Sequence, residues 1–385
     1  MVNGPLWCYF YAMKYVDNEN PMASMRFSCT QVSPNSLVYG TEDDLRKGLS
    51  SIETYAKPER VFVENNCSVS LVGDDVQGIA DQMDLPWPVY AMDSGGMKGS
   101  FEAGYSAASL RIEKEMKTKE KIPASVNVLG LSTVHMKGRE DAEEIRRLLS
   151  LCGIRVISMP GGGSNWDDIM GAPSASLNIV VRDELGLSLA KQMEQDFGTP
   201  YMSCGLPYGT DGTMAWLSEI IEKLGAGELT HASHEAAKLK EFLLRKGNNL
   251  ESLWGPLWFD AVLISAPPSE ALGIAEAIRS EWIDTARLCV HAQCETEKST
   301  PAADAIRVVM KNEKEIAKDY EDWQGGLVLS SSHETHLLRR MGRSFTGFHI
   351  ALPSHDEVHF SDLPQCGLRG AGYLYEQLWN AKLRK

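Results

Sequence analysis

Two cysteines in the first seventy residues stand where a thiolate could act as a metal ligand. Cys8 lies three positions after the dipeptide Gly4-Pro5. Cys67 follows the β-branched and aromatic run 61–63, which is typical of a buried strand, and precedes a polar turn and a helix predicted at 74–83. Backbone N–H groups and the helix dipole stabilise a thiolate at the start of a helix. Both positions therefore suit thiolates that loop ends present to a metal cluster.

A simpler interpretation of the same residue type stands beside this one. Free cysteine is among the most buried residue types and mostly behaves as a small hydrophobe. We expect that role for Cys152, Cys289 and Cys294. Cys8 and Cys67 are far apart in the sequence and lack the paired C-x-x-C spacing of a strong metal motif. Taken alone, they favour burial in a core over metal binding.

A glycine-rich turn follows the predicted strand 87–92. It contains Gly95, Gly96 and Lys98, and a helix is predicted to begin at Phe101. Open parallel sheets bind ligands at the carboxyl ends of their strands, so this turn is a candidate cofactor-binding site. The alternative is a plain turn in which the glycines supply positive φ angles.

Strand-like and helix-like segments alternate along the chain, which predicts parallel sheets covered by helices. We predict an α/β fold of three successive Rossmann-like open parallel-sheet units. A charge-dense linker ends the first unit, and a long helix ends the second. The predicted domains are residues 1–121, which bear the candidate cluster ligands, residues 122–245, and residues 246–385, which include a C-terminal helix.

Three local expectations concern single elements. Thr41 is expected to cap a helix at 42–55 with its side chain. Residues 302–321 are expected to form one helix, and residues 350–353 the last strand.

Composition limits the class of protein. The 385 residues are 43% hydrophobic and 23% charged, with a formal net charge of −14, which argues against nucleic-acid and membrane-surface binding. This charge is compatible with docking to the basic face of a partner protein. No apolar run is long enough to span a bilayer, and the first residues do not resemble a secretory signal. Eight scattered cysteines do not form a disulfide framework, so we expect a reducing, cytoplasmic location.

Three motifs carry a resemblance to a known family. They are Gly4-Pro5-x-x-Cys8, then Leu37-Val38-Tyr39-Gly40 before an amphipathic helix, then the segment Asn66–Asp75 that contains Cys67. In this order they resemble the component 1 family of nitrogenase and its relatives. Those relatives include dark-operative protochlorophyllide reductase and the scaffold proteins that build nitrogenase cofactor. The resemblance covers nearly the whole chain and implies the same three-domain α/β architecture.

The resemblance implies that Cys8 and Cys67 are ligands of an iron–sulfur cluster, a [4Fe-4S] cubane. Such a cluster requires four ligands, usually thiolates. A cluster shared across a subunit interface, with two cysteines from each chain, is the leading interpretation. Cys29 is a third candidate ligand, and a non-cysteine ligand such as Asp17 or Glu19 is a further alternative.

The resemblance also bears on a second cofactor. Nitrogenase holds its iron–molybdenum cofactor by a cysteine after a strand that matches residues 177–181, and by a histidine near the carboxyl end. Arg182 stands at the cysteine position here, and His355 near the place of the histidine. We therefore expect no nitrogenase-type cofactor and no N2 reduction. The candidates to line a pocket for another substrate are His355, His359, Lys98, Glu102 and Arg182. For the two histidines the alternative is a surface loop, and for Arg182 it is an ion pair at a helix start.

Together these features predict a subunit of a nitrogenase-like oxidoreductase. It would accept electrons from an ATP-dependent iron protein through the interface cluster and reduce a bound substrate other than N2. It would form a homo- or hetero-dimer or tetramer with a component 1-like subunit. The alternatives are a non-catalytic scaffold for cofactor or cluster assembly, and a subunit that only supports a catalytic partner.

Overall fold

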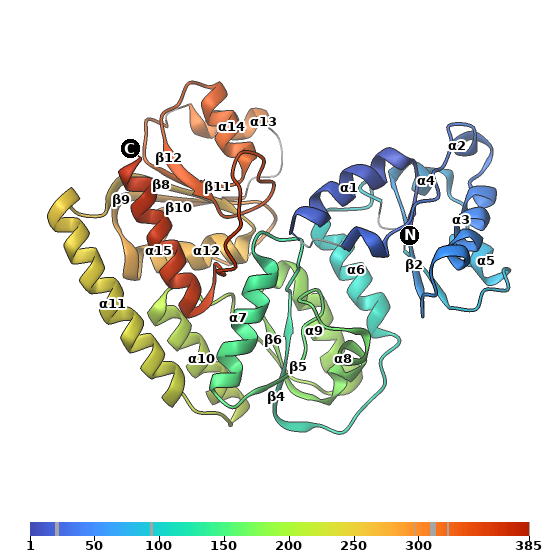
Figure 1. Ribbon diagram of the computed structural model, residues 1–385, viewed down its shortest axis with the longest axis horizontal. Coiled ribbons are helices and arrows are strands. Elements are labelled where there is room, and N and C mark those ends of the chain that lie inside the picture. The colour runs from blue at the N-terminus through green and yellow to red at the C-terminus, as the bar shows by residue number, and fades with distance from the viewer. Residues whose placement is uncertain (20–22, 93–94, 297, 309–312, 322, 385) are drawn as a thin grey trace. The chain divides into compact units, whose positions relative to one another are not determined.

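The fold consists of parallel sheets covered by helices (Figure 1). The computed structural model describes residues 1–19, 23–92, 95–296, 298–308, 313–321 and 323–384. The described chain forms two compact units, Met1–Lys114 and Glu115–Lys385. Within it, every strand pair of the three sheets is parallel. This confirms the predicted α/β class with three open parallel sheets. The division into three domains at residues 122 and 246 stays a prediction.

The first unit is built on a three-stranded sheet in the order β1-β2-β3. The strands are β1 (Val2–Asn3), β2 (Val61–Asn65) and β3 (Val89–Met92). The helices are α1 (Leu6–Glu19), α2 (Ser36–Tyr39), α3 (Glu42–Tyr55), α4 (Cys67–Val72), α5 (Val76–Asp81) and α6 (Phe101–Glu113), with a 3-10 turn at Ala23–Arg26. Helical spacing puts Leu45, Leu49 and Ile52 on one face of α3, and this face is buried in a core with Val61 and Val63 of β2.

The second unit contains two sheets. A four-stranded sheet has the order β5-β4-β6-β7, and a five-stranded sheet the order β10-β9-β8-β11-β12. The strands are β4 (Ile122–Leu129), β5 (Arg155–Ser158), β6 (Ala175–Val180), β7 (Tyr201–Ser203), β8 (Trp258–Ala266), β9 (Asp284–Ala292), β10 (Ala305–Val308), β11 (Leu327–Ser330) and β12 (Thr346–His349).

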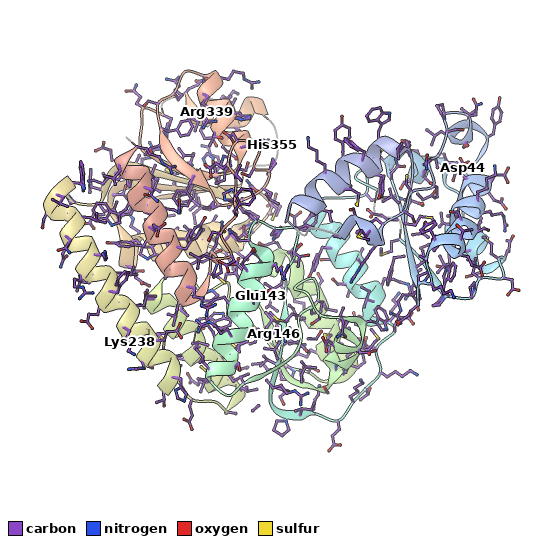
Figure 2. All side chains as sticks on the ribbon, viewed as in Figure 1. Asp44, Glu143, Arg146, Lys238, Arg339 and His355 are labelled. Atoms are coloured by element: carbon purple, nitrogen blue, oxygen red, sulfur yellow. The ribbon has the colours of Figure 1, made fainter. Side chains whose placement is uncertain are left out.

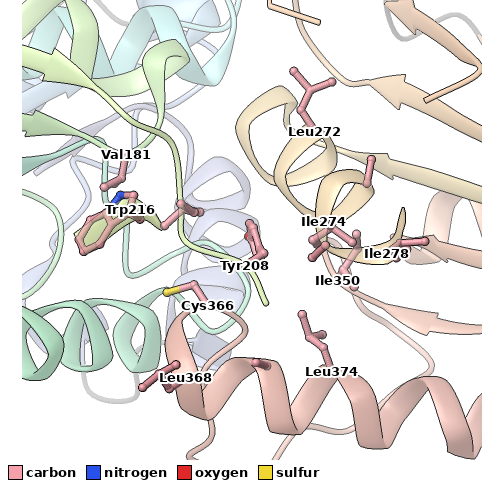
Figure 3. Close-up of a cluster of buried hydrophobic side chains, with 14 of the residues drawn as sticks. Val181, Tyr208, Trp216, Leu272, Ile274, Ile278, Ile350, Cys366, Leu368 and Leu374 are labelled. Carbon is pink, nitrogen blue, oxygen red and sulfur yellow. The ribbon is translucent and has the colours of Figure 1, made fainter. Parts of the chain in front are cut away.

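Helices join these two sheets into one buried core. They are α7 (Gly138–Leu151), α8 (Trp166–Gly171), α9 (Asp183–Phe197), α10 (Thr210–Leu224), α11 (Thr230–Trp254), α12 (Pro268–Ala277), α13 (Glu313–Tyr320), α14 (Ser332–Arg340) and α15 (Gly367–Leu383), with short turns at Ala172–Ser174 and Ile278–Trp282. The C-terminal helix α15 packs against α7, α10 and α11. Leu368 and Leu374 of α15 share a cluster with Trp216 of α10 and Ile274 of α12 (Figure 3). This shared burial makes residues 115–385 one compact unit.

The three local expectations are wrong in detail. Thr41 precedes α3, but its hydroxyl donates to Asp74 at 2.7 Å, so it makes no side-chain cap. Part of the predicted helix 302–321 is strand β10, because Ala305–Val308 pairs with β9, and among the described residues of this stretch α13 is the helix. The last strand is β12, four residues earlier than expected. Ile350 follows β12 and donates its N–H to the carbonyl of Ser330, the last residue of β11.

A buried ion pair connects the two sheets of the second unit. Arg182 follows β6 and is 0% exposed. Its Nε and Nη2 atoms donate to Oε1 of Glu270, in the first turn of α12, at 2.9 and 2.6 Å. Its Nη1 donates to the carbonyl of Gly130 at 3.2 Å, and Asp141 Oδ2 lies 4.0 Å from Nη2. The ion pair proposed for Arg182 is therefore confirmed, and this side chain faces no open pocket.

The free energy of this pair depends on both partners. Burial raises the pKa of Glu270 to about 7, and the charge of Arg182 opposes that shift. Removal of one partner of a buried ion pair typically costs about 3–5 kcal/mol, because the remaining group must either stay charged without its counterion or take up a proton.

We predict that Arg182→Met lowers the free energy of unfolding by about 3–5 kcal/mol, measured by urea denaturation. The matched control is Arg139→Met, which breaks an exposed pair with Glu143 at 3.1 Å on the surface of α7. Figure 2 labels Glu143. The control should lose at most about 1 kcal/mol. Equal losses in the two variants would contradict the role given to burial.

A second prediction concerns acid stability. His291 of β9 is buried and stacks on Tyr320, and burial lowers the pKa of its imidazole to about 4. An unfolded histidine titrates near 6.5, so between pH 6.5 and 4 only the unfolded chain binds this proton. The free energy of unfolding should therefore fall as the pH is lowered through this range, by about 1.4 kcal/mol per pH unit from this group. His291→Asn should remove that contribution in denaturation series at several pH values, and an unchanged pH slope would refute it.

Candidate metal centre

Cys67 is the first residue of helix α4, a helix that the sequence did not predict, because the expected helix was 74–83. β2 ends at Asn65, and α4 begins at Cys67, whose side chain is exposed. The residue between them, Asn66, is the N-cap, and its Oδ1 accepts the backbone N–H of Val69 at 3.0 Å. The strand, the cap and the helix thus hold Cys67 at a defined position on the surface of the first unit.

Cys8 lies in a helix and not at the end of a loop, which corrects the sequence prediction. Helix α1 begins at Leu6, and the N–H of Cys8 donates to the carbonyl of Pro5 in its first turn. The apolar run that follows Pro5 has no clear one-sided pattern, so the sequence did not predict this helix. The side chain of Cys8 is exposed, like that of Cys67.

One asparagine brings the two cysteines together. The Nδ2 atom of Asn66 donates to the Sγ atom of Cys8 at 3.1 Å, and Asn66 precedes Cys67 in the chain. Gly4 makes this approach possible, because a Cβ atom there would lie only 2.6 Å from Cγ of Asn66. The Gly-Pro motif and the Asn-Cys motif, distant in sequence, are therefore neighbours in space.

Cys29 lies near Cys8, but its side chain is only partly exposed, whereas those of Cys8 and Cys67 are exposed. It forms an isolated bridge with Val2, and its Sγ donates to the carbonyl of Gly4 at 3.3 Å. Burial raises the pKa of its thiol, and the nearby Cys8 adds to the shift. Cys29 is thus close to the candidate ligands, but its surroundings favour a thiol over a thiolate ligand.

The glycine-rich turn lies against the cysteine helix. A Cβ atom on Gly96 would lie 3.3 Å from Sγ of Cys67, and one on Gly95 only 2.6 Å from Oγ of Ser70. Close approach of the backbone therefore accounts for these glycines. Lys98 is exposed on the same turn, and its N–H donates to the carbonyl of Gly95 at 2.7 Å. The role of this turn in cofactor binding stays a prediction.

The ligands of one chain do not complete a metal site. Among the residues with described side chains, which exclude Asp17 and Glu19, no three His, Cys, Asp or Glu residues converge so as to hold a metal ion. Two exposed cysteines on one surface fit half of the four-thiolate set of a [4Fe-4S] cluster. The donors present therefore fit a cluster whose other ligands come from elsewhere.

An apolar surface surrounds Cys8 on α1. Trp7 is 70% exposed and Phe10 is 54% exposed, and Leu6 and Tyr11 are exposed too. The ring of Trp7 lies 6.3 Å from that of Tyr11 and 6.5 Å from that of Phe10. Contiguous exposed aromatic surface of this kind is typical of a protein–protein contact.

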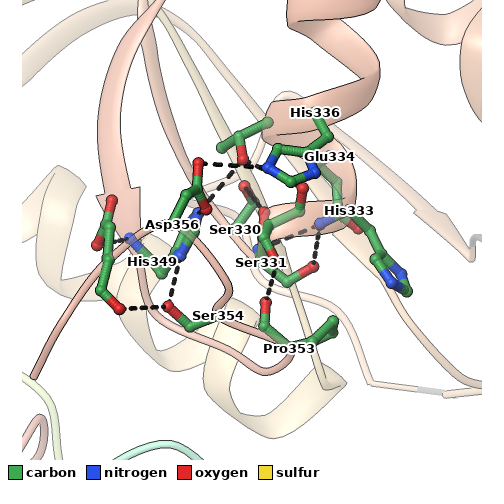
Figure 4. Close-up of polar contacts among 12 residues, drawn as sticks. Ser330, Ser331, His333, Glu334, His336, His349, Pro353, Ser354 and Asp356 are labelled. Atoms are coloured by element: carbon green, nitrogen blue, oxygen red, sulfur yellow. Dashed lines mark hydrogen bonds and ion pairs between the residues drawn. The ribbon is translucent and has the colours of Figure 1, made fainter.

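His355 belongs to the second unit, on the loop after β12, where it is exposed (Figure 2). Its chain neighbours form a polar network that the sequence did not predict (Figure 4). His349 Nδ1 lies 2.8 Å from Oγ of Ser354, and His349 Nε2 lies 3.4 Å from Oδ1 of Asp356. Burial lowers the pKa of both His349 and His359, although Asp356 and Glu357 oppose the two shifts.

This network borders a cavity of about 350 Å³, which His349, Glu357 and His359 help to line. His349 is the last residue of β12, and its contacts with Ser354 and Asp356 come from the fold, whereas His359 was already a candidate from the sequence. Whether His355 contributes to substrate binding stays a prediction.

No helix in the described parts of the chain is long and apolar enough to cross a membrane.

Comparisons with known proteins agree with this fold. The chain is 29% identical over 260 residues to the nitrogenase iron-molybdenum cofactor biosynthesis protein NifE of Clostridium pasteurianum. The matched region covers 66% of this chain and 54% of that protein. It is 23% identical over 373 residues to a light-independent protochlorophyllide reductase subunit of Chloroherpeton thalassium, covering 92% and 69%. The chain thus spans about half the length of the NifE relative.

A solved structure and a family profile match the whole chain. The structure titled "Nitrogenase Cp1 at pH 6.5" superposes with a TM-score of 0.75 at 16% identity, covering 100% of this chain and 88% of that chain, so the likeness concerns the fold alone. The profile of the nitrogenase component 1 type oxidoreductase family matches residues 1–383. The chain therefore belongs to the nitrogenase component 1 type oxidoreductase family.

Proposed function

We propose that this chain is a component 1-like subunit in which Cys8 and Cys67 hold half of a [4Fe-4S] cluster at a subunit interface. The observation that carries the proposal is the contact of Asn66 with Cys8, which brings two exposed cysteines to one surface of the first unit. The exposed aromatic side chains of α1 supply apolar surface beside that cluster for a second component 1-type subunit. That subunit is a copy of this chain or a related chain.

In this proposal Cys8 and Cys67 would hold the cluster, and the chemistry that it would supply is the transfer of single electrons between an ATP-dependent iron protein and a bound substrate. The net charge of −14 supports docking of a partner with a basic face. The substrate is other than N2, because Arg182, at the end of β6, is a buried cation paired with Glu270 and offers no thiolate. A reducing, cytoplasmic location suits such a cluster and stays a prediction.

The second candidate function is a scaffold for cofactor or cluster assembly. It is favoured by the similarity to a NifE protein, whose name is that of a cofactor biosynthesis protein. A scaffold gives its metal to an acceptor, whereas an electron-transfer subunit keeps its cluster. A supporting subunit without a cluster of its own is the third candidate.

The cluster is tested by metal content. After anaerobic reconstitution with ferrous iron and sulfide, the full chain should hold about two iron atoms, half of a shared cubane, with a paramagnetic resonance signal after dithionite reduction. Cys8→Ser and Cys67→Ser should each lose this iron, because a hydroxyl is a poor substitute for a thiolate ligand.

The matched control for these variants is Cys294→Ser, a change of the same type in the second unit, which should keep the iron of the wild type. Iron that stays bound in both Cys8→Ser and Cys67→Ser would refute the assignment of the ligands. No iron in the wild type, with or without a component 1-type partner, would favour the supporting subunit.

Retention of iron separates the electron-transfer role from the scaffold role. Protein loaded with radioactive iron is incubated with a nitrogenase component 1 protein that lacks its cofactor, and the two are then separated. We expect the radioactivity to remain with this chain, because a cluster with ligands from two subunits is enclosed by them. Transfer to the acceptor would overturn the electron-transfer role and support the scaffold.

A further inference from the structure

The side chain of Asn66 is held at both ends of its amide group. Its Oδ1 accepts the N–H of Val69 at 3.0 Å, which caps α4, and its Nδ2 donates to Sγ of Cys8 at 3.1 Å. The first contact lies within its own helix start, and the second reaches a residue 58 positions earlier in the chain. Because one planar amide makes both contacts, the cap orients the donor toward the sulfur.

The surrounding backbone prevents this amide from turning away. The N–H of Asn66 donates to the carbonyl of Asn3 at 3.1 Å, and its carbonyl accepts the N–H of Ser70 at 2.9 Å. Gly4 packs against the amide so closely that any side chain there would collide with it, and Gly95 approaches the Asn66 backbone. The N–H group is therefore preorganised at the sulfur and needs no rearrangement when the charge on that sulfur changes.

We propose that Asn66 is a positioning residue that sets the reduction potential of the cluster by donating a hydrogen bond to the Cys8 sulfur. This inference rests on the proposed function, in which Cys8 is a cluster ligand. Reduction adds one electron to the cluster and increases the negative charge on its sulfur atoms. A hydrogen bond to a ligand sulfur stabilises that reduced form more than the oxidised form, so it raises the potential.

A purely structural role of Asn66 makes a different prediction. If the residue only capped α4, any substitution that kept the cap would leave the potential unchanged. Serine is such a residue, because its hydroxyl caps helices about as well as an asparagine amide. Asn66→Ser carries no charge and has no N–H group with which to donate to Cys8. It therefore separates the cap from the donor.

The test is a redox titration of the reconstituted full chain in its assembled form, followed by paramagnetic resonance. Asn66→Ser should keep the iron content of the wild type and show a more negative midpoint potential. Asn66→Asp, which keeps the shape and the cap but replaces the donor with a charged acceptor, should shift the potential further in the same direction. Equal potentials in Asn66→Ser and the wild type, with full iron content, would overturn the inference and leave the proposed cluster intact.

The matched control is Asn65→Ser, the same change one residue earlier. The Oδ1 of Asn65 accepts from Nδ2 of Asn3 at 2.9 Å, a buried contact without a sulfur atom. This variant should lose stability and keep the wild-type potential. A shift as large as that of Asn66→Ser would mean that general loosening moves the potential, and would overturn the inference. A wild type without iron would instead refute the proposed function, and this inference with it.

Discussion

The close packing of Gly4 against the side chain of Asn66, which donates a hydrogen bond to the Cys8 sulfur, is the contact around which the candidate metal centre is built. The hydrogen bond connects the first turn of α1 to the junction between β2 and α4, and these two segments are 58 residues apart in the sequence. Gly4 clears the space for it, and Gly95 and Gly96 let a third segment approach from the other side. These three glycines allow close packing around the Asn66 amide and the two thiols. The Gly-Pro motif, the Asn-Cys motif and the glycine-rich turn are therefore in contact with one another.

The exposure of both cysteines distinguishes this site from a structural metal site closed within one chain. Structural sites usually draw all their ligands from one chain and enclose the metal. Here the two thiols face outward from the first unit, and the aromatic side chains of α1 are exposed beside Cys8. Such a surface gains free energy when a second subunit removes it from water. In the proposed function, assembly of the subunits and completion of the cluster would be one event, which would couple metal binding to oligomerisation.

The second unit contains a buried ion pair between its two sheets. Its two sheets meet through the buried pair of Arg182 and Glu270, which stabilises the native arrangement only while both partners are present. The same arginine puts a cation where the nitrogenase resemblance places a cofactor thiolate. A guanidinium with its donors occupied by Glu270 and Gly130 cannot bind a metal. The His349 network and its cavity lie in this unit as well, so polar side chains line a cavity there.

The sequence by itself determined the parallel α/β class, because alternating buried strands and amphipathic helices leave few other architectures. It also placed Cys67 just after a strand, since the β-branched run of β2 is a local feature, but it did not predict the cap at Asn66 or the short helix α4. Only the tertiary structure decided that Cys8 begins a helix, that Asn66 reaches its sulfur, and that β10 replaces part of a predicted helix. The contact of His349 with Ser354 likewise could not be predicted from the sequence. Local patterns report the conformation of neighbours in the chain, whereas these features come from contacts between distant segments, and burial against those segments overrides local preference.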